Sequence, residues 1–461
     1  MFSVHNQVIH LIGIGGIGVS GLAEILHSLG FTVQGSDQVN SGNTKRLENI
    51  GIKVFIGHSE ANVAKADIVV YSSAIHPNNV ELKKARSLNI PCLTRGEMLS
   101  QVVRLKKSVV VAGSHGKTTV TSLCAELLEL ANLQPTVVNG GIINSYGSNA
   151  KLGKGDWAVI ESDESDGSFI HLLPSIAIVT NIDKEHTKNY GSFRNLQDAF
   201  VNFIENVPFY GVAVVCKDDP NTGYVLEKIR NRKVITYGLN ENVDVQGINV
   251  RRTDEGSVFD VKYNNKVIES VRIPLFGIHN VRNALSIIAL ANILGIDISI
   301  TKTVLANFTG TRRRFTTVGN IGDVLVIDDY AHHPTEIKAL LDAAHQRKPG
   351  KVVIIHQPHR FTRLNCFFDD FCTCFSSADT VVLLPVYKAD EIVDAPLNSL
   401  HLLGSLKNSM SSVYYAENKV ALQKTVKNIV DEQKLGKDDI ILFSGAGNIS
   451  SWAYEIVSAL Q

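Results

Sequence analysis

A short segment near residue 115 carries the residue types that phosphate binding needs. An apolar run, residues 109–112, leads into Gly113-Ser114-His115-Gly116-Lys117-Thr118-Thr119. In such a loop the backbone N–H groups surround phosphate oxygens, the lysine reaches the terminal phosphates, and the next hydroxyl can ligate Mg²⁺. The usual G-x-x-x-x-G-K-[ST] pattern would begin at Val111, but the first glycine here is Gly113, so the loop is two residues shorter. The segment predicts a nucleoside triphosphate site, and the alternative is an ordinary strand-to-helix turn.

A second glycine segment, Gly13-Ile14-Gly15-Gly16-Ile17-Gly18, follows the apolar residues 8–12. Its spacing is typical of a loop that places a nucleotide phosphate at a helix N-terminus. Gly35-Ser36-Asp37 ends the next predicted strand, and Asp37 stands where a ribose-binding carboxylate would. Taken alone, this pattern predicts a dehydrogenase, or a tight turn without a ligand. The phosphate loop argues against a dehydrogenase, which has no use for it.

Two further strands of the middle of the chain are expected to end in polar residues. Residues 157–161 run into an acidic cluster, and Glu161 at the end of the apolar run is the predicted Mg²⁺ ligand. Glu164 and Asp166 also fit a solvated loop. After residues 178–180 comes His186, which suits a second metal, an anionic substrate or a structural role.

The C-terminal half carries four more polar segments. Residues 277–284 precede an apolar helical stretch, which fits either ligand-reading amides or simple helix capping. Residues 311–315 gather three arginines, which suit phosphate oxygens or a solvated linker. Residues 328–336 and 356–363 follow two consecutive predicted strands and contain His, Asp and Arg. Two adjacent strand ends of this kind predict an anion-binding pocket.

Short apolar runs alternate with helical patterns along the chain, which predicts an α/β fold with parallel sheets and crossover helices. Ligands of such folds bind at the carboxyl ends of the strands. The predicted strands are residues 8–12, 68–71, 108–112, 158–161, 176–180, 212–216, 324–327, 352–355, 380–384 and 440–443. Residues 244–272 alternate between polar and apolar instead, with a turn at 263–266, which indicates an antiparallel excursion.

Composition narrows the class of protein. A chain of 461 residues predicts two to four domains, with three as the central expectation, and residues 104–107 and 310–314 as boundaries. Lys+Arg and Asp+Glu are both 45, so no global charge favours nucleic acid or an anionic membrane. Residues 285–296 are too short to cross a bilayer, and nothing at the start resembles an export signal. The six scattered cysteines are expected to be free thiols.

The ordered series of these segments resembles that of the Mur ligase family. The resemblance rests on residues 113–119, 161–171, 180–186, 277–283, 313–315, 328–334, 357–363 and 445–447, and it spans nearly the whole chain. Residues 164–171 and 357–360, with the N-terminal glycine segment, are most similar to the member that adds L-alanine to UDP-N-acetylmuramate. A sister member that recycles murein tripeptide onto the same sugar shares most of the motifs.

The resemblance implies a cytoplasmic ATP-dependent ligase, a monomer or weak homodimer, that uses ATP, Mg²⁺, UDP-N-acetylmuramate and L-alanine and no nucleic acid or membrane. It implies three α/β domains. These are a Rossmann-like UDP-sugar domain at 1–105, a central P-loop-type ATPase domain at 106–311, and a Rossmann-like C-terminal domain at 312–461.

The site residues carried over by the resemblance fall into four groups. The catalytic group is Lys117, Glu161, His186 and Arg360, and the metal ligands are Thr118, Glu161 and His186. ATP is assigned to Gly113, Ser114, His115, Gly116, Lys117, Thr118, Thr119, Asn280, Asn283, Arg314 and Asp329. The UDP-sugar is assigned to Gly15, Gly16, Ile17, Gly18, Ser36, Asp37, Ser73 and Arg95. The substrate carboxylates and the amino acid are assigned to Tyr330, His332, Arg360 and Arg363.

The chain departs from the family's pattern at a few positions. Ser114, Glu185 and Ala331 replace the usual threonine, aspartate and glycine, and the first two keep the functional group. Residues 385–391 differ from the usual run at two positions, which leaves the shape of the amino-acid pocket open. A dehydrogenase and a nucleotide-sensing binding protein remain alternatives of another class, to be separated by nicotinamide absorbance and by phosphate release.

Overall fold

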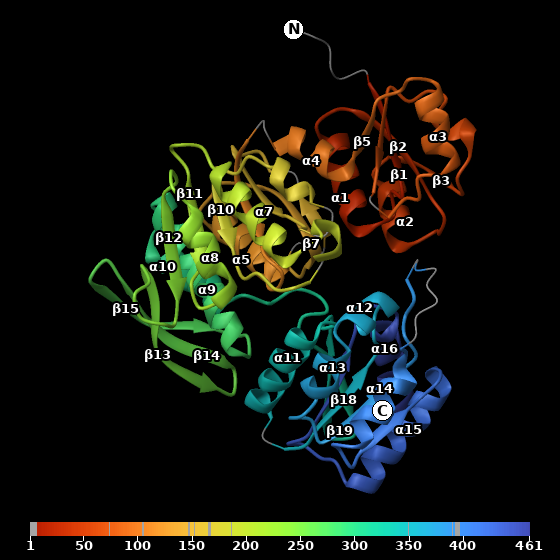
Figure 1. Ribbon diagram of the computed structural model, residues 1–461, viewed down its shortest axis with the longest axis vertical. Helices are drawn as coiled ribbons and strands as arrows, with labels where there is room; N and C mark the ends of the chain where they lie inside the picture. Colours follow the sequence, from red (N-terminus) through yellow and green to blue (C-terminus); the bar gives the residue numbers. More distant parts are fainter. Residues whose placement is uncertain are drawn as a thin grey trace. The chain divides into compact units, whose positions relative to one another are not determined.

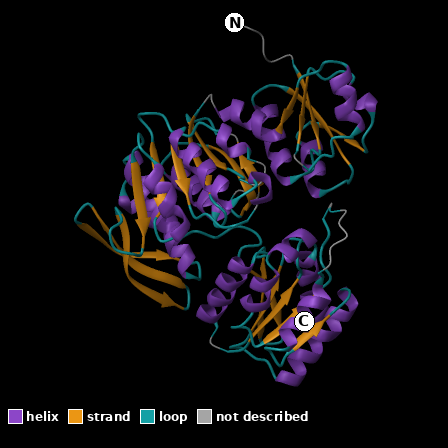
Figure 2. Ribbon diagram, in the orientation of Figure 1, coloured by secondary structure: helices purple, strands orange, loops and turns teal. Residues whose placement is uncertain are grey.

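Parallel sheets flanked by helices make up the computed structural model (Figures 1 and 2). It describes residues 7–461 apart from 73, 104–105, 146–147, 152, 165–166, 186, 349, 390 and 392–396. The chain divides into two compact units, the first made of Met1–Asn249, Phe259–Val271 and Arg282–Thr309, the second of Val250–Val258, Arg272–Val281 and Gly310–Gln461. The predicted α/β class is confirmed, and each strand expected from an apolar run is present with its ends shifted by at most two residues.

The N-terminal sheet has the strand order β3-β2-β1-β4-β5, which matches the first five strands of the dinucleotide-binding order 3-2-1-4-5-6. The paired strands are parallel, and apolar clusters around Leu11 and around Ile12 cover its two faces. Its elements are β1 (Val8–Ile12), α1 (Ile17–Ser28), β2 (Thr32–Asp37), α2 (Gly42–Asn49), β3 (Lys53–Ile56), the 3-10 turn η2 (Glu60–Val63), β4 (Ile68–Tyr71), α3 (Val80–Ser87), β5 (Cys92–Thr94) and α4 (Arg95–Val103).

The central sheet is the largest, with ten strands in the order β15-β14-β13-β12-β11-β10-β6-β9-β7-β8. Strands β6, β7, β9, β10, β11 and β12 pair in parallel, whereas β8 pairs antiparallel with β7. Strands β6, β10 and β11, at the centre of the sheet, consist mainly of buried Val, Ile and Ala, as expected of a sheet covered on both faces. The strands are β6 (Lys107–Ala112), β7 (Thr136–Ile143), β8 (Ser148–Lys151), β9 (Trp157–Glu161), β10 (Ile176–Val179), β11 (Val212–Cys216), β12 (Val234–Gly238), β13 (Val245–Thr253), β14 (Gly256–Tyr263) and β15 (Lys266–Ile273). The helices are α5 (Lys117–Leu130), η3 (Ser168–His171), α6 (Thr187–Tyr190), α7 (Phe193–Glu205), α8 (Pro220–Lys228), α9 (Ile278–Leu294) and α10 (Ile298–Ala306).

The predicted antiparallel excursion is the edge formed by β13, β14 and β15. Neighbouring strands β14 and β15 are joined by a two-residue turn at Asn264 and Asn265, whose φ angles are 47° and 58°. Two left-handed residues make the tight turn that suits an antiparallel hairpin, and asparagine tolerates this conformation.

The C-terminal sheet has the order β16-β17-β21-β18-β19-β20, antiparallel only between β16 and β17. Two separate apolar cores, one around Leu341 and one around Val426, cover its two faces, and Figure 2 shows helices on both sides. Its elements are β16 (Thr316–Ile321), β17 (Val324–Asp329), α11 (Pro334–Arg347), β18 (Val352–His356), α12 (Phe361–Cys366), α13 (Phe368–Cys374), β19 (Thr380–Leu383), α14 (Ser399–Lys407), β20 (Val413–Tyr415), α15 (Lys419–Gln433), β21 (Ile440–Ser444) and α16 (Ile449–Leu460).

Two expectations about the chain as a whole can be compared with the structure. All six cysteines are free thiols, as predicted. Over the described part of the chain, no helix is long and apolar enough to cross a bilayer.

Candidate active site

The phosphate loop joins the buried strand β6 to helix α5 and depends on two glycines with positive φ, Gly113 at 130° and Gly116 at 81°. A Cβ atom at Gly113 would lie 2.2 Å from Thr180 Oγ1 and 2.9 Å from the backbone oxygen of Asn181. Only glycine therefore lets the loop pass this close to the end of β10.

The residues that follow β10 hold the loop in place. Asn181 accepts the N–H of Ser114 at its backbone oxygen (3.0 Å) and the N–H of His115 at Oδ1 (2.8 Å). Thr180 Oγ1 donates back to the His115 carbonyl (2.7 Å), and the N–H of Asp183 donates to Ser114 Oγ (2.8 Å). The segment selected from the sequence for His186 is thus a scaffold for the phosphate loop. His186 itself lies outside the described residues.

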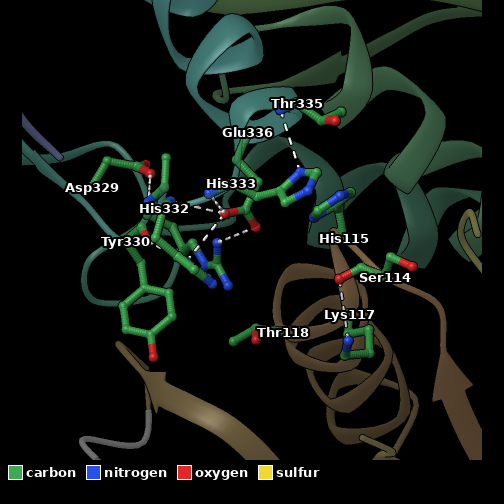
Figure 3. A network of polar contacts seen from close by, with 12 residues as sticks. Ser114, His115, Lys117, Thr118, Asp329, Tyr330, His332, His333, Thr335 and Glu336 are labelled. Atoms are coloured by element: carbon green, nitrogen blue, oxygen red, sulfur yellow. Dashed lines mark hydrogen bonds and ion pairs between the residues drawn. The ribbon is translucent and has the colours of Figure 1, made fainter. Parts of the chain in front are cut away.

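Lys117 is folded back over the loop. Its Nζ donates to the backbone oxygens of Gly113 (2.6 Å) and Ser114 (3.2 Å), the latter shown in Figure 3, and to Glu164 Oε2 (2.7 Å). These acceptors match the three N–H donors of an ammonium group. Glu164 is fully buried, so it is not the solvated acid that the sequence allowed.

Electrostatics keep Lys117 charged. Burial alone would lower its pKa, but the carboxylates of Glu164, Asp163 and Glu161 outweigh burial and raise it. Burial raises the pKa of Glu164 to about 7, although the ammonium acts in the opposite direction. A fixed positive charge therefore stands in the phosphate loop, as phosphoryl transfer requires.

The two described residues that the sequence assigns to Mg²⁺ lie in contact. Thr118 Oγ1 donates to Glu161 Oε1 (3.1 Å), and the N–H of Gly140 donates to Glu161 Oε2 (2.7 Å). A hydroxyl and a carboxylate at a strand's end are the hard oxygen ligands that Mg²⁺ prefers beside phosphates. The donor set therefore fits this ion.

Sequence reasoning missed Gly140. Its Cβ would lie 2.5 Å from Glu161 Oε1, so a larger residue would displace the carboxylate. A signal was present, because Asn139-Gly140-Gly141 follows the strand-like residues Thr136-Val137-Val138.

Helix α9 begins at Ile278, so one local expectation was wrong: Asn280 and Asn283 lie inside the helix and not ahead of it. Asn283 faces the phosphate loop, since a Cβ on Gly116 would lie 3.0 Å from its Oδ1. Asn280 donates from Nδ2 to the backbone oxygen of Phe276 (2.8 Å).

The N-terminal glycine loop is held by the end of β2. Gly13 and Ile14 donate their N–H groups to the Ser36 carbonyl (2.8 and 3.0 Å), and Gly15 donates to Asp37 Oδ2 (2.8 Å). The fully buried Ser36 hydroxyl donates to Glu81 (2.5 Å). Both predicted UDP-sugar residues of β2 therefore shape the loop.

Arg95, at the start of α4, brings positive charge to the same loop. A Cβ on Gly18 would lie 2.7 Å from an Arg95 guanidinium nitrogen, so the two predicted ligand residues are neighbours. Gly16 is the N-cap of α1, where amides and the helix dipole favour an anion. Ser73 lies outside the described residues, as does the side chain of Ile17.

In the C-terminal sheet, Asp329 ends β17 and organises the loop around it. Its carboxylate accepts the N–H groups of Phe315 (2.7 Å) and Ala331 (2.7 Å). Burial raises the pKa of Asp329 to about 6, while Arg314 acts to lower it. The predicted nucleotide ligand thus also fixes the arginine segment.

Polar side chains follow β17 within the same unit. Glu336 Oε2 accepts the N–H of His332 (3.0 Å) and lies 3.2 Å from its Nδ1, as Figure 3 shows. Arg314 and Arg313 lie over the Tyr330 ring at 5.3 and 4.7 Å. The arrangement gathers cationic groups at the carboxyl end of this strand.

The loop after β18 adds further cations. His359 stacks on Tyr387 with ring centroids 5.5 Å apart, and Arg363 donates to the His359 carbonyl (3.1 Å). Burial lowers the pKa of His359 to about 3, with His332 and nearby arginines acting in the same direction. Arg360 is exposed and has a φ of 68°, a backbone conformation that is uncommon for a residue other than glycine or asparagine. Arg360 and Arg363 thus bring positive charge to the end of β18, where the sequence predicts an anion-binding pocket.

A Rossmann-like sheet, a second sheet that carries a phosphate loop and a third sheet with arginines at its strand ends define a nucleotide-using enzyme of several domains. Family models match all three parts: the Mur ligase family catalytic domain at residues 8–107, the Mur ligase middle domain at 111–291 and the glutamate ligase domain at 313–447.

Whole-chain comparisons agree. The chain is 46% identical to a UDP-N-acetylmuramate–L-alanine ligase of Brucella anthropi over 98% of this chain and 97% of that one. A crystal structure of UDP-N-acetylmuramate–alanine ligase from Thermotoga maritima matches with a TM-score of 0.84 at 30% identity, over 98% of this chain and 99% of that one. A murein peptide ligase of Psychrobacter arcticus shares the fold, with a TM-score of 0.72 at 23% identity over 99% of both chains. The chain belongs to the Mur ligase family, whose members use ATP.

Proposed function

We propose that this enzyme joins L-alanine to UDP-N-acetylmuramate at the expense of ATP and releases ADP and phosphate, in peptidoglycan precursor synthesis. The observation that carries the proposal is the 46% identity, over 98% of the chain, to ligases named for this reaction. The residues agree with it, because the phosphate loop is complete and its lysine is charged.

The chemistry takes place in two steps. The γ-phosphoryl group of ATP is transferred to the muramoyl carboxylate, which gives an acyl phosphate, and Lys117 neutralises charge on the moving oxygens. The amine of L-alanine then attacks the acyl carbon, and phosphate leaves as the amide bond forms. Water would hydrolyse the acyl phosphate, so the site must exclude it during turnover.

For Mg²⁺ we propose Thr118 and Glu161 as ligands, with His186 serving a second ion. The support is the contact between the Thr118 hydroxyl and the Glu161 carboxylate. The bound ion would supply positive charge to the phosphate oxygens.

The remaining assignments follow the resemblance. We propose domains at 1–105, 106–311 and 312–461. Arg360, with Tyr330, His332 and Arg363, receives the substrate carboxylates, and its exposed, strained position supports this role. The ATP and UDP-sugar residues remain those named from the sequence.

We also propose that the enzyme works in the cytoplasm as a monomer or weak homodimer, without nucleic acid or membrane partners. The support for the absence of nucleic acid and membrane partners is the zero formal net charge, which offers no global attraction to polyanions, and the location and oligomeric state follow the resemblance.

The decisive experiment is a phosphate-release assay with ATP, Mg²⁺ and UDP-N-acetylmuramate, run in parallel with L-alanine, glycine, L-serine and murein tripeptide. We expect the largest kcat/KM with L-alanine. A preference for the tripeptide would assign the chain to the recycling reaction, and no phosphate release with any acceptor would overturn the proposal.

A further inference from the structure

The two residues assigned to Mg²⁺, Thr118 and Glu161, are part of a closed ring of hydrogen bonds. Thr118 Oγ1 donates to Glu161 Oε1 (3.1 Å), and the Gly140 N–H donates to Glu161 Oε2 (2.7 Å) and, more weakly, to Asn139 Oδ1 (3.1 Å). Asn139 Nδ2 donates to Ser122 Oγ (2.8 Å), which donates to the Thr118 carbonyl (2.7 Å). The ring thus joins α5, β7 and β9.

The side chain of Asn139 has one orientation that satisfies this ring. Ser122 Oγ gives its only proton to the Thr118 carbonyl, so it must accept from Asn139, which requires the NH₂ group on that side. The amide oxygen then faces the Gly140 N–H. Asn139 is 2% exposed and Ser122 is fully buried, so water does not replace either contact.

The glycines after Asn139 show how closely this strand approaches the ligands. A Cβ on Gly140 would lie 2.5 Å from the Glu161 carboxylate, and one on Gly141 would lie 2.8 Å from Thr118 Cγ2. Small shifts of β7 are therefore transmitted to both ligands.

We propose that Asn139 is a positioning residue that orients Thr118 and Glu161 for the divalent cation, without touching the cation itself. The proposal rests on the metal assignment made above. Removal of the amide frees Ser122 Oγ and the Gly140 peptide, so the Glu161 carboxylate loses its fixed direction. Loss of such outer partners costs about 10- to 100-fold in metal affinity.

The test measures metal binding and not turnover. Mn²⁺ replaces Mg²⁺ because it is paramagnetic, and the free ion is titrated by electron paramagnetic resonance in the presence of a non-hydrolysable ATP analogue. We expect Asn139→Ala to raise the Mn²⁺ dissociation constant about tenfold or more. Affinity for the analogue without metal should stay within about twofold, since Lys117 and the loop amides are unaltered.

Two further variants separate positioning from general destabilisation. Thr136→Val removes a buried hydroxyl on the same strand, hydrogen-bonded to the N–H of Gly153 (3.2 Å), and should leave Mn²⁺ affinity unchanged. Ser122→Ala breaks the ring on its helix side with a small change in volume and should weaken Mn²⁺ binding several-fold even if Asn139→Ala does not fold.

Wild-type Mn²⁺ affinity in both Asn139→Ala and Ser122→Ala would overturn the proposal, as would an equal loss in Thr136→Val. If wild-type protein binds no Mn²⁺ with the analogue, the metal assignment and the proposal fall together. The Mn²⁺ titration contains no amino acid, so its result does not depend on which amino acid the enzyme uses. If the phosphate-release assay shows no reaction with L-alanine, weaker Mn²⁺ binding by Asn139→Ala would still support the positioning role.

Discussion

The two glycine loops of the chain have the same local design, but a carboxylate contacts the amides of the first and an ammonium contacts the carbonyls of the second. Each joins a buried strand to the N-terminus of a helix, at Gly13 to Gly18 and at Gly113 to Gly116. In the first loop the Gly15 amide donates to the carboxylate of Asp37, whereas the second loop carries the ammonium of Lys117. The spacing of the glycines therefore determines where the backbone N–H groups of each loop lie. The charged side chains beside a loop then determine how much negative charge a bound ligand can carry.

Support for the two loops also differs. The first depends on Ser36, whose hydroxyl donates to the buried Glu81 carboxylate. In the second loop, the neutral Asn181 accepts the N–H groups of Ser114 and His115, and the ammonium of Lys117 donates to the carbonyls of Gly113 and Ser114. We therefore expect the loops to respond differently to substitution and to acid.

The largest expected effect separates the loops by chemistry. Lys117→Ala removes the charge that neutralises the transferred phosphoryl group and should lower kcat by about a thousandfold or more. Affinity for UDP-N-acetylmuramate, measured by calorimetry, should stay within about twofold of wild type. A large loss of affinity for the UDP-sugar would contradict the assignment of the two ligands to separate loops.

A matched pair of alanine substitutions tests the difference in packing. Gly113→Ala places a methyl group against Thr180 and the Asn181 backbone at a φ of 130°, so phosphate release should fall at least about a hundredfold and the Tm should drop. Gly18→Ala meets only the end of the Arg95 side chain, which can move, so the Tm should change little and only the KM for the UDP-sugar should rise. Equal losses of phosphate release in the two variants would contradict this difference.

Much of this arrangement was predictable from the sequence, because local chemistry dictates it. The apolar runs predicted the buried strands. Residue type and position singled out Lys117, Thr118 and Glu161 as candidate site residues, and the fold brings Thr118 into contact with Glu161. The two left-handed asparagines at 264 and 265 gave the hairpin. Apart from that contact, these features depend on neighbours within a few residues of one another.

Contacts between distant residues were not predictable. The sequence does not reveal that Glu164 is fully buried against Lys117, because that depends on how the segment after β9 packs. The role of Asn181 as the anchor of the phosphate loop depends on the pairing of β6 with β10. Asp37 matches a ribose-binding pattern, and its Oδ2 accepts the N–H of Gly15 in the glycine loop. This contact depends on the register between β1 and β2, which the sequence does not reveal.

The smallest expected effect concerns acid. Burial would raise the pKa of Glu81, but hydrogen bonds from His10, Ser36 and Asn62 outweigh it and lower the pKa from its ordinary 4.5 to about 2. The ionised carboxylate therefore stabilises the folded state above about pH 4.5, by roughly 3 kcal/mol, and this contribution is lost as the pH falls towards 2.

Between pH 5 and pH 3.5, the contribution of the Glu81 carboxylate to the free energy of unfolding should fall by about 1 kcal/mol. It should appear as faster hydrogen exchange in β1 and in residues 13–18, next to Ser36. The central loop at 113–116 should keep its protection, because its N–H groups at Ser114 and His115 donate to the neutral Asn181. Glu81→Gln should abolish this pH dependence, and Glu60→Gln, which removes an exposed carboxylate paired with Lys84, should preserve it. If both loops lose protection together in wild type, or if Glu81→Gln retains the pH dependence, the buried carboxylate is not the support that distinguishes the N-terminal loop from the central one.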